Sequence, residues 1–252
     1  MERFLREVSD LSGGNLAVSV YSFSAKALKD LETQFLSGMP FQYLLKESEF
    51  FGQRLFVNEN VLIPRPETEH LVDMIVRSKK KFSTALDIGT GSGAIILSLI
   101  KAGVAGKGTG SDISREALAV ARINQRRLRL SDHTEFVHAD RFEGIHGKFD
   151  LIVTNPPYIR ATAHRPLVHE KVDWHEPHIA LYLQDSSFES WFHELFCGVL
   201  KHLSPGGEFW MEGHENELQG QSIALERLGF TDVKVLKDLS GMDRFIFAKS
   251  PV

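Results

Sequence analysis

The fold of this chain is decided by one stretch, LDIGTGSG at residues 86–93, in which an apolar strand runs into a glycine-rich turn and then a helix. Glycines let a ligand approach the backbone where a side chain would collide, and the amides at a helix N-terminus can receive a carboxylate. Nucleotide-binding dehydrogenases use a loop of the same kind, so the loop alone does not name its ligand.

Short apolar strands alternate with helices on either side of this loop. Strands are expected at 84–88, before Asp112, at 135–137, 149–154, 208–211, 233–236 and 244–248, and helices at 94–102, 115–128 and 218–228. This alternation predicts an α/β, Rossmann-like fold with a mostly parallel seven-stranded sheet, helices on both faces and an antiparallel hairpin at one edge.

The region before residue 81 has a different organisation. Residues 1–40 carry apolar positions at helical spacing and end at Gly38, which predicts a short helical segment. Residues 48–63 have the pattern of a β-hairpin, and the sequence PRPETE at 64–69 predicts an extended entry into a helix that Glu67 or Thr68 can cap. We therefore divide the chain into residues 1–40, residues 41–80 and a catalytic domain at 81–252.

Composition restricts the partners and the compartment. The formal net charge of −4 provides no overall field for a phosphate backbone, so direct recognition of nucleic acid is not expected. No apolar stretch approaches the roughly 18 residues that span a bilayer. The single cysteine, Cys197, lies among apolar residues, which predicts a buried side chain in a reducing compartment. We expect a cytoplasmic protein with no membrane association.

Asp87 and Asp140 favour S-adenosylmethionine over a dinucleotide as the ligand of the loop, whereas Asp112 fits either ligand. Asp87 ends the strand before the loop, where a carboxylate would repel a pyrophosphate but attract a methionine ammonium group. Asp112 has the spacing of an acid that holds ribose hydroxyls, and Asp140 is suited to accept a hydrogen bond from the adenine amino group. Asp112 and Asp140 also have a plain structural reading, as loop or helix-capping residues.

The second motif is NPPY at residues 155–158, which follows the apolar strand 149–154 and so projects from the carboxyl end of the sheet. A planar NH2 group is a poor nucleophile, and acceptors must fix its N–H bonds and aim its nitrogen at a methyl group. The Asn155 side-chain oxygen and the Pro156 carbonyl can do this, Pro157 stiffens the turn, and Tyr158 can pack on the flat acceptor. No strong general base is required.

Two other groups of residues have alternative readings. Histidines and acids gather between residues 169 and 178, but their spacing does not match a closed zinc site and no cysteine joins them, so we expect a loop over the acceptor pocket and no metal. Trp191 and Phe192 lie on an apolar helical pattern and are expected in the core.

These motifs together resemble the PrmC/HemK family of peptide chain release factor glutamine methyltransferases. The resemblance spans about residues 40–250 and is most specific at VLIPRPETE (61–69), the glycine-rich loop, residues 149–159, HEP (175–177) and DLSGMDR (238–244). The motif NPPY is shared with adenine-specific DNA methyltransferases, whereas PRPETE is not, so PRPETE decides between them.

The resemblance implies a class I methyltransferase that methylates the side-chain amide of the glutamine in the Gly-Gly-Gln motif of release factors, and we expect a monomer. It implies that the donor is held by Asp87, Gly89, Thr90, Gly91, Ser92, Gly93, Asp112, Asp140, Arg141, Phe142 and Asn155. It implies that the acceptor is held by Arg65, Pro66, Glu67, Thr68, Asn155, Pro156, Pro157 and Tyr158, with Asn155, Pro156 and Tyr158 catalytic.

The chain departs from the family pattern in three places. Residues 1–40 are shorter than the helical bundle that usually precedes the shared region, Arg141 stands where an aromatic often covers the adenine, and EGHE at 212–215 replaces a Glu-Ile-Gly turn. Either Arg141 or Phe142 could cover the adenine. Three alternatives stay open at this point: a ribosomal-protein glutamine as acceptor, adenine in nucleic acid, and a scaffold without catalysis.

Overall fold

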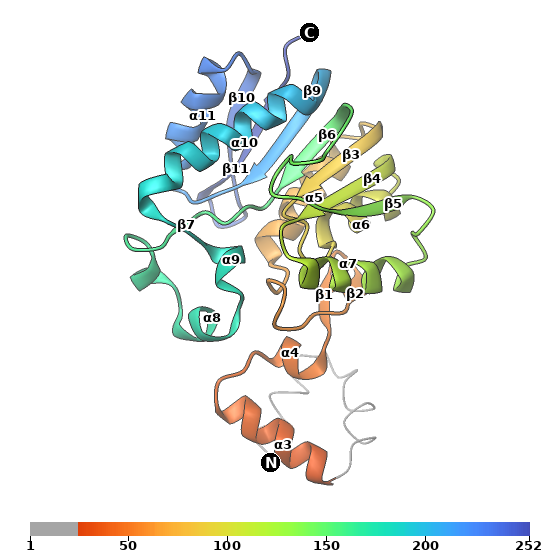
Figure 1. Cartoon of the computed structure of the whole chain (residues 1–252), viewed down its shortest axis with the longest axis vertical. Coiled ribbons are helices and arrows are strands. Elements are labelled where there is room, and N and C mark those ends of the chain that lie inside the picture. Colours follow the sequence, from red (N-terminus) through yellow and green to blue (C-terminus); the bar gives the residue numbers. More distant parts are fainter. Residues whose placement is uncertain (1–24) are drawn as a thin grey trace.

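The computed structural model describes residues 25–252, and a seven-stranded sheet forms its centre, in the order β10-β11-β9-β6-β3-β4-β5 (Figure 1). The strands are β3 (Phe82–Ile88), β4 (Ala105–Asp112), β5 (Thr134–His138), β6 (Phe149–Thr154), β9 (Leu203–Glu212), β10 (Thr231–Lys237) and β11 (Asp243–Lys249). Strands β9, β6, β3, β4 and β5 are parallel, and β11 is antiparallel to both β9 and β10. The predicted sheet and its antiparallel edge are confirmed.

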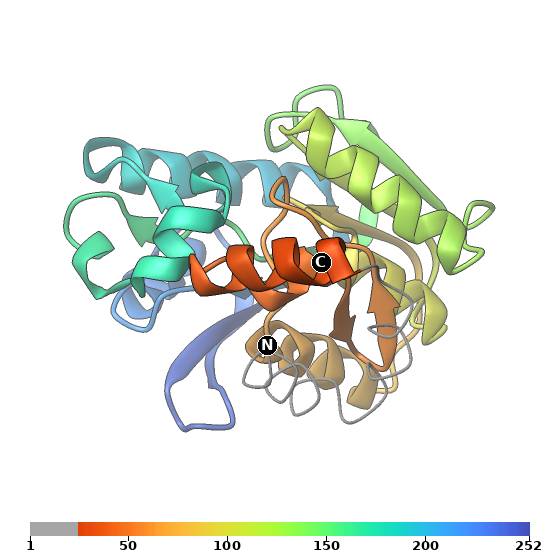
Figure 2. The same ribbon diagram turned by 90° about the horizontal axis from the view of Figure 1, so that it is seen from below.

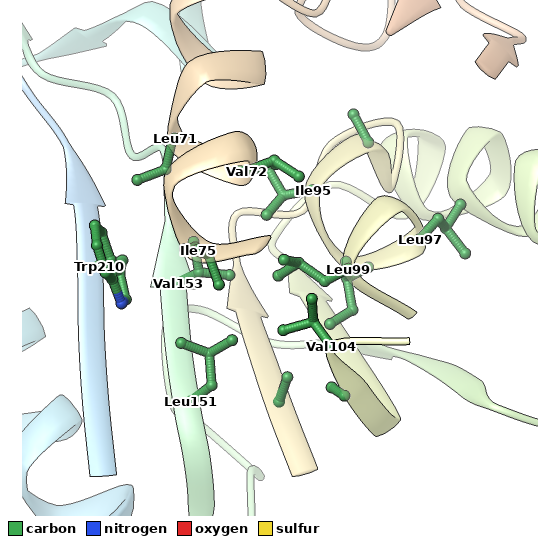
Figure 3. Close-up of a cluster of buried hydrophobic side chains, with 14 of the residues drawn as sticks. Leu71, Val72, Ile75, Ile95, Leu97, Leu99, Val104, Leu151, Val153 and Trp210 are labelled. Carbon is green, nitrogen blue, oxygen red and sulfur yellow. The ribbon is translucent and has the colours of Figure 1, made fainter. Parts of the chain in front are cut away.

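Helices cover both faces of the sheet because its central strands are apolar on both sides. Leu151 and Val153 of β6 belong to a cluster with α5 (Pro66–Arg77) and α6 (Ala94–Lys101), as Figure 3 shows. Ile152, which lies between them, points to the opposite face and packs with α10 (Phe188–His202) and α11 (Leu218–Arg227). Burial that alternates with a period of two residues places the two helical layers against one sheet. A further helix, α7 (Arg115–Arg127), contacts β4 and β5.

The N-terminal elements form a small assembly at the carboxyl end of the parallel strands. They are α3 (Ala25–Leu36), α4 (Phe41–Leu45) and the antiparallel pair β1 (Ser48–Phe50) and β2 (Gln53–Leu55). The hairpin is shorter than expected, since Val57, Val61 and Ile63 lie outside any strand and pack instead against Tyr43 and α7. Of the helical segment predicted at 1–40, residues 1–24 lie outside the described part of the chain.

A long segment between β6 and α10 lies at this same end of the molecule. It contains β7 (Ile159–Arg160), η1 (Arg165–Leu167), α8 (Glu170–His175), α9 (His178–Leu181), β8 (Tyr182–Leu183) and η2 (Asp185–Ser187). Figure 2, which shows the molecule from below, has α8 and α9 beside the red helix α3. A Cβ atom added at Gly38 would lie 3.6 Å from the His175 ring, so the two segments are in contact.

Two local predictions are wrong. Helix α5 begins at Pro66 with Arg65 as its N-cap and no capping side chain, so neither Glu67 nor Thr68 caps it. Cys197 is exposed, because helix α10 turns its sulfur away from the face that buries Phe196 and Val199. Within the described residues, no helix is long and apolar enough to cross a membrane.

Candidate active site

A cleft of about 230 Å³ lies at the carboxyl end of the parallel strands. Its walls come from segments that are far apart in the chain. They include Pro64, Arg65 and Thr68, Gly89 to Ser92, Asp112 to Ser114, Ala139 to Arg141, Thr154 to Pro157, Pro177, Ile179, Ala180 and Trp191. The cleft thus brings both predicted motifs, the glycine-rich loop and NPPY, into one site.

Gly89 and Gly91 provide a surface on which a ligand can lie against the backbone. Both have positive φ, at 69° and 54°, and a Cβ at either would meet nothing within 4 Å in the described chain. Gly93 differs, because a Cβ there would lie 2.9 Å from the Leu97 side chain and Gly93 does not line the cleft. Gly93 instead allows the close packing of helix α6, whose N-cap it forms with φ of 81°.

Asp87 lies beneath the loop and not in the cleft. Its carboxylate is fully buried, and its Oδ2 accepts a hydrogen bond from the Thr90 hydroxyl at 2.7 Å. Its Oδ1 is buried without a hydrogen-bond partner among the described residues. Burial raises the pKa of Asp87 to about 7. Asp87 therefore holds the loop through Thr90.

Asp112 has the arrangement expected of an acid that binds a ribose. Its Oδ2 accepts the backbone N–H of Gly91, and its Oδ1 accepts that of Ser114, both at 2.8 Å. Burial raises the pKa of Asp112, and these two backbone N–H groups oppose the rise. Because each carboxylate oxygen has a second lone pair, Asp112 can still accept from two adjacent hydroxyls.

The far end of the cleft is bounded by Asp140, Arg141 and Trp191. The Arg141 guanidinium lies 5.4 Å from the centre of the Trp191 ring and 2.9 Å from a carboxylate oxygen of Glu194. Phe142 does not line the cleft, since its ring stacks on His202 with 4.7 Å between centroids. Of the two residues considered for covering an adenine, only Arg141 lines the cleft, and its contact with an adenine stays a prediction. Trp191 was expected in the core, but it is half-buried and lines the cleft beside Arg141.

Asn155 heads the acceptor side of the cleft, with Pro156 and Pro157 lining it on the same side. The Asn155 Nδ2 donates to the Thr68 hydroxyl at 3.0 Å, and that hydroxyl donates to Glu212 Oε2 at 2.7 Å. The Tyr158 hydroxyl donates to the other Glu212 oxygen at 3.0 Å. Tyr158 does not line the cleft, and its packing on the acceptor stays a prediction.

Glu212 is a residue that the sequence motifs did not single out as part of the site. Its side chain is buried at 1% exposure, which raises the pKa of its carboxyl, while hydrogen bonds from Thr68 and Tyr158 and the charge of Arg244 oppose the rise. Burial of the Tyr158 phenol itself, followed by the negative charge of Glu212, raises the pKa of Tyr158. Both hydroxyls therefore keep their protons and act as donors.

Arg65 and Glu176 join the acceptor side to the segment that contains α8 and α9. Glu176 accepts the Ile63 backbone N–H at 3.1 Å as well as the Arg65 guanidinium. Pro66 and Glu67 are exposed and do not line the cleft, so only Arg65 and Thr68 of the predicted group reach it. Among residues 25–252, the histidines and acids do not form a cluster that could hold a metal ion.

The donor side fits the adenosyl and methionine parts of S-adenosylmethionine. The open backbone at Gly89 and Gly91 leaves room for the ligand, the free lone pairs of Asp112 suit a pair of hydroxyls, and the Asp140 carboxylate, which lines the cleft beside Arg141, could accept a hydrogen bond from an adenine amino group.

Known proteins support a methyltransferase. The family described as "Methyltransferase small domain" matches residues 66–173. A release factor glutamine methyltransferase of Flavobacterium psychrophilum is 38% identical over 216 residues, which cover 82% of this chain and 74% of the relative. One of Lactococcus lactis is 37% identical over 257 residues, or 98% and 91% of the two chains. The chain belongs to the family of release factor glutamine methyltransferases.

Solved structures agree with the fold. A methyltransferase from Pyrococcus furiosus superposes with a TM-score of 0.59 at 18% identity, over 91% of this chain and 100% of the other. A T. thermophilus 16S rRNA methyltransferase, solved in complex with AdoMet and guanosine, has a TM-score of 0.58 at 18% identity over 81% and 49%. The class I methyltransferase fold and the family resemblance are confirmed.

Proposed function

We propose that this enzyme transfers a methyl group from S-adenosylmethionine to the side-chain amide nitrogen of a glutamine in a peptide chain release factor, namely the glutamine of its Gly-Gly-Gln motif. The relatives named above carry this activity in their names, and they cover most of the chain. One structural observation supports it most directly. The Asn155 amide lies in the same cleft as the glycine-rich loop, with its nitrogen already bonded to Thr68.

The chemistry follows from this arrangement. When bound, S-adenosylmethionine supplies a methyl group on a positively charged sulfur, which keeps the electron pair of the C–S bond that breaks. The glutamine nitrogen forms the new N–C bond and then releases a proton to water. The Asn155 Oδ1 and the Pro156 carbonyl accept hydrogen bonds from the two N–H groups of the substrate glutamine. These bonds remove rotational freedom from the glutamine amide and aim its nitrogen at the methyl group. Arg65 and Thr68 border the same space.

The proposal also covers the partners and the compartment. We propose that the chain acts as a monomer in the cytoplasm, on a protein and without direct recognition of nucleic acid. The modest negative charge of the chain supports the last point, since a nucleic-acid enzyme would need a basic surface.

Methylation of purified release factor with labelled donor tests the proposal. Label is expected on the Gly-Gly-Gln glutamine, and Asn155→Ala should lower kcat by roughly 100-fold or more, because one of the two acceptors is lost. Donor affinity should change little, and exposed Asn216→Ala serves as the control. A release factor that stays unlabelled while the donor binds would refute the proposed substrate. Label on a ribosomal protein or on DNA would identify a different substrate.

A further inference from the structure

The catalytic use of Asn155 depends on which way its amide is turned. The oxygen and nitrogen of an asparagine side chain are similar in size, and the two orientations differ by a half-turn. Only one orientation presents the oxygen to an N–H in the cleft. The opposite one presents an NH2 group, which cannot accept a hydrogen bond from the acceptor amide.

The hydrogen count at Thr68 selects one of these orientations. A threonine hydroxyl has a single hydrogen, and the 2.7 Å bond to Glu212 uses it. The Thr68 oxygen, 3.0 Å from the Asn155 side chain, then has only lone pairs to offer. Asn155 must therefore donate to Thr68 with Nδ2, which leaves its Oδ1 free for the acceptor.

Glu212 is placed to impose this direction. Strand β9 lies beside β6 with Met211 paired to Thr154, so Glu212 and Asn155 each follow directly after paired residues. An ionised carboxylate can only accept hydrogen bonds, and Glu212 accepts one at each oxygen, from Thr68 and from Tyr158. Burial raises the pKa of Glu212, whereas the Arg244 charge and these two donors oppose the rise, and a hydroxyl donor at each oxygen is the arrangement of an ionised carboxylate.

We propose that Glu212 is a positioning residue: through the Thr68 hydroxyl it fixes the Asn155 amide with its oxygen toward the acceptor nitrogen. This inference rests on the proposed function, since it describes how the same site orders its acceptor. Glu212 does not line the cleft and acts only through Thr68.

The test compares Glu212→Gln with changes at Thr68. A glutamine can accept from only one of the two hydroxyls, because its other terminal atom carries hydrogens. We expect Glu212→Gln and Thr68→Val each to lower kcat for release factor methylation by roughly 10- to 100-fold. The KM for release factor and the Kd of the donor should stay within roughly threefold of wild type. Thr68→Ser, which keeps the hydroxyl, should keep most of the activity.

A double variant and a matched control distinguish a positioning role of Glu212 from a general loss of stability. The double variant Glu212→Gln/Thr68→Val should be no slower than either single variant within roughly twofold, because both break one chain of hydrogen bonds. Glu208→Gln is the control: Glu208 lies on the same strand, is 3% exposed, and pairs with Lys80 and with the Trp210 indole N–H at 3.2 Å. It should lower the melting temperature as much as Glu212→Gln does, without the loss of kcat.

An NMR measurement makes the inference independent of the substrate. The side-chain NH2 protons of Asn155, assigned by their loss in Asn155→Ala, should exchange faster with solvent in Glu212→Gln than in wild type. Unchanged exchange, unchanged kcat, additive double variants, or an equal loss of kcat in Glu208→Gln would each overturn the inference. If wild type binds the donor but does not methylate release factor, the proposed function fails, while the exchange result still decides the role of Glu212.

Discussion

Arg65 and Glu176 form an ion pair with 2.5 Å between Nη2 and Oε1, although 111 residues separate them in the chain. The Glu176 side chain is 1% exposed and that of Arg65 is 32% exposed. Glu176 precedes Pro177, Ile179 and Ala180, which line the cleft. The pair thus fastens one wall of the cleft to the start of α5.

Removing this pair should loosen that wall. We expect Glu176→Ala to lower the free energy of unfolding by about 2 kcal/mol, because the Ile63 N–H loses its buried acceptor and Arg65 loses its partner. The KM for release factor should rise while the donor Kd stays constant. Chemical denaturation and steady-state kinetics measure these effects, with exposed Glu170→Ala of α8 as the control. An unchanged KM would mean that the wall does not depend on the pair.

The open space beside the Gly91 backbone should be needed for binding of the methyl donor. Gly91→Ala puts a methyl group into space that the donor would occupy, and we expect donor affinity to fall roughly 10-fold or more. Gly144→Ala is a matched control, because Gly144 also has positive φ, at 72°, and open space around it but lies outside the cleft. Both variants should lose about 1 kcal/mol of stability from backbone strain. Calorimetric titration with the donor separates them, and equal affinities would contradict this use of Gly91.

Arg141 and Trp191, rather than Phe142, should contact the adenine end of the donor. We expect Arg141→Ala and Trp191→Ala each to weaken donor binding roughly 3- to 30-fold, through loss of stacking and cation–π contact. Phe142→Ala should lower the melting temperature instead, since its ring packs on His202 and over Gly198. Donor titrations beside thermal melts measure both. Weaker binding in Phe142→Ala with unchanged stability would reverse the assignment.

Asp87 should make stability dependent on pH. Its folded pKa of about 7 lies above the ordinary 3.8, so the folded state binds the extra proton between these values. Its contribution is therefore fully present below about pH 4 and is lost as pH rises through 7. Without donor, we expect stability to fall by up to a few kcal/mol across this window, and Asp87→Asn to flatten the fall. An identical pH dependence in the variant would contradict it. Because the pKa values of Glu212 and Asp112 are also raised, part of the pH dependence of stability should remain in Asp87→Asn.

Local patterns in the sequence were enough to predict the glycine-rich loop and the strands of the sheet. Strand, glycine turn and helix are consecutive around residues 86–101, and Asp112 ends the next strand, so periodicity and spacing were enough to predict these elements, whereas the places of Phe142 and Trp191 were not predicted. The same holds for NPPY, which directly follows β6. These features depend on neighbours in the chain and not on the order of strands.

Other features depend on which elements become neighbours. Glu212 reaches the site because β9 lies beside β6, and no local pattern states that order. Glu176 lies in the family segment HEP and in the group considered for a metal, but its contacts could not be predicted, because its partners Ile63 and Arg65 are more than a hundred residues away. Cys197 was predicted to be buried because its neighbours in sequence are apolar. Those neighbours share one buried face of the helix, and the cysteine lies on an exposed face.

The hydrogen bonds around Asn155 have a consequence for folding. The donor loop needs contacts over short distances in the chain, such as the 21 residues between Gly91 and Asp112. The acceptor side needs Thr68 to meet Asn155 over 87 residues and Glu212 over 144. Closing such long loops costs more entropy and is generally slow. A chain emerging from the ribosome should therefore acquire a place for the methyl donor well before it can direct the methyl group to a substrate.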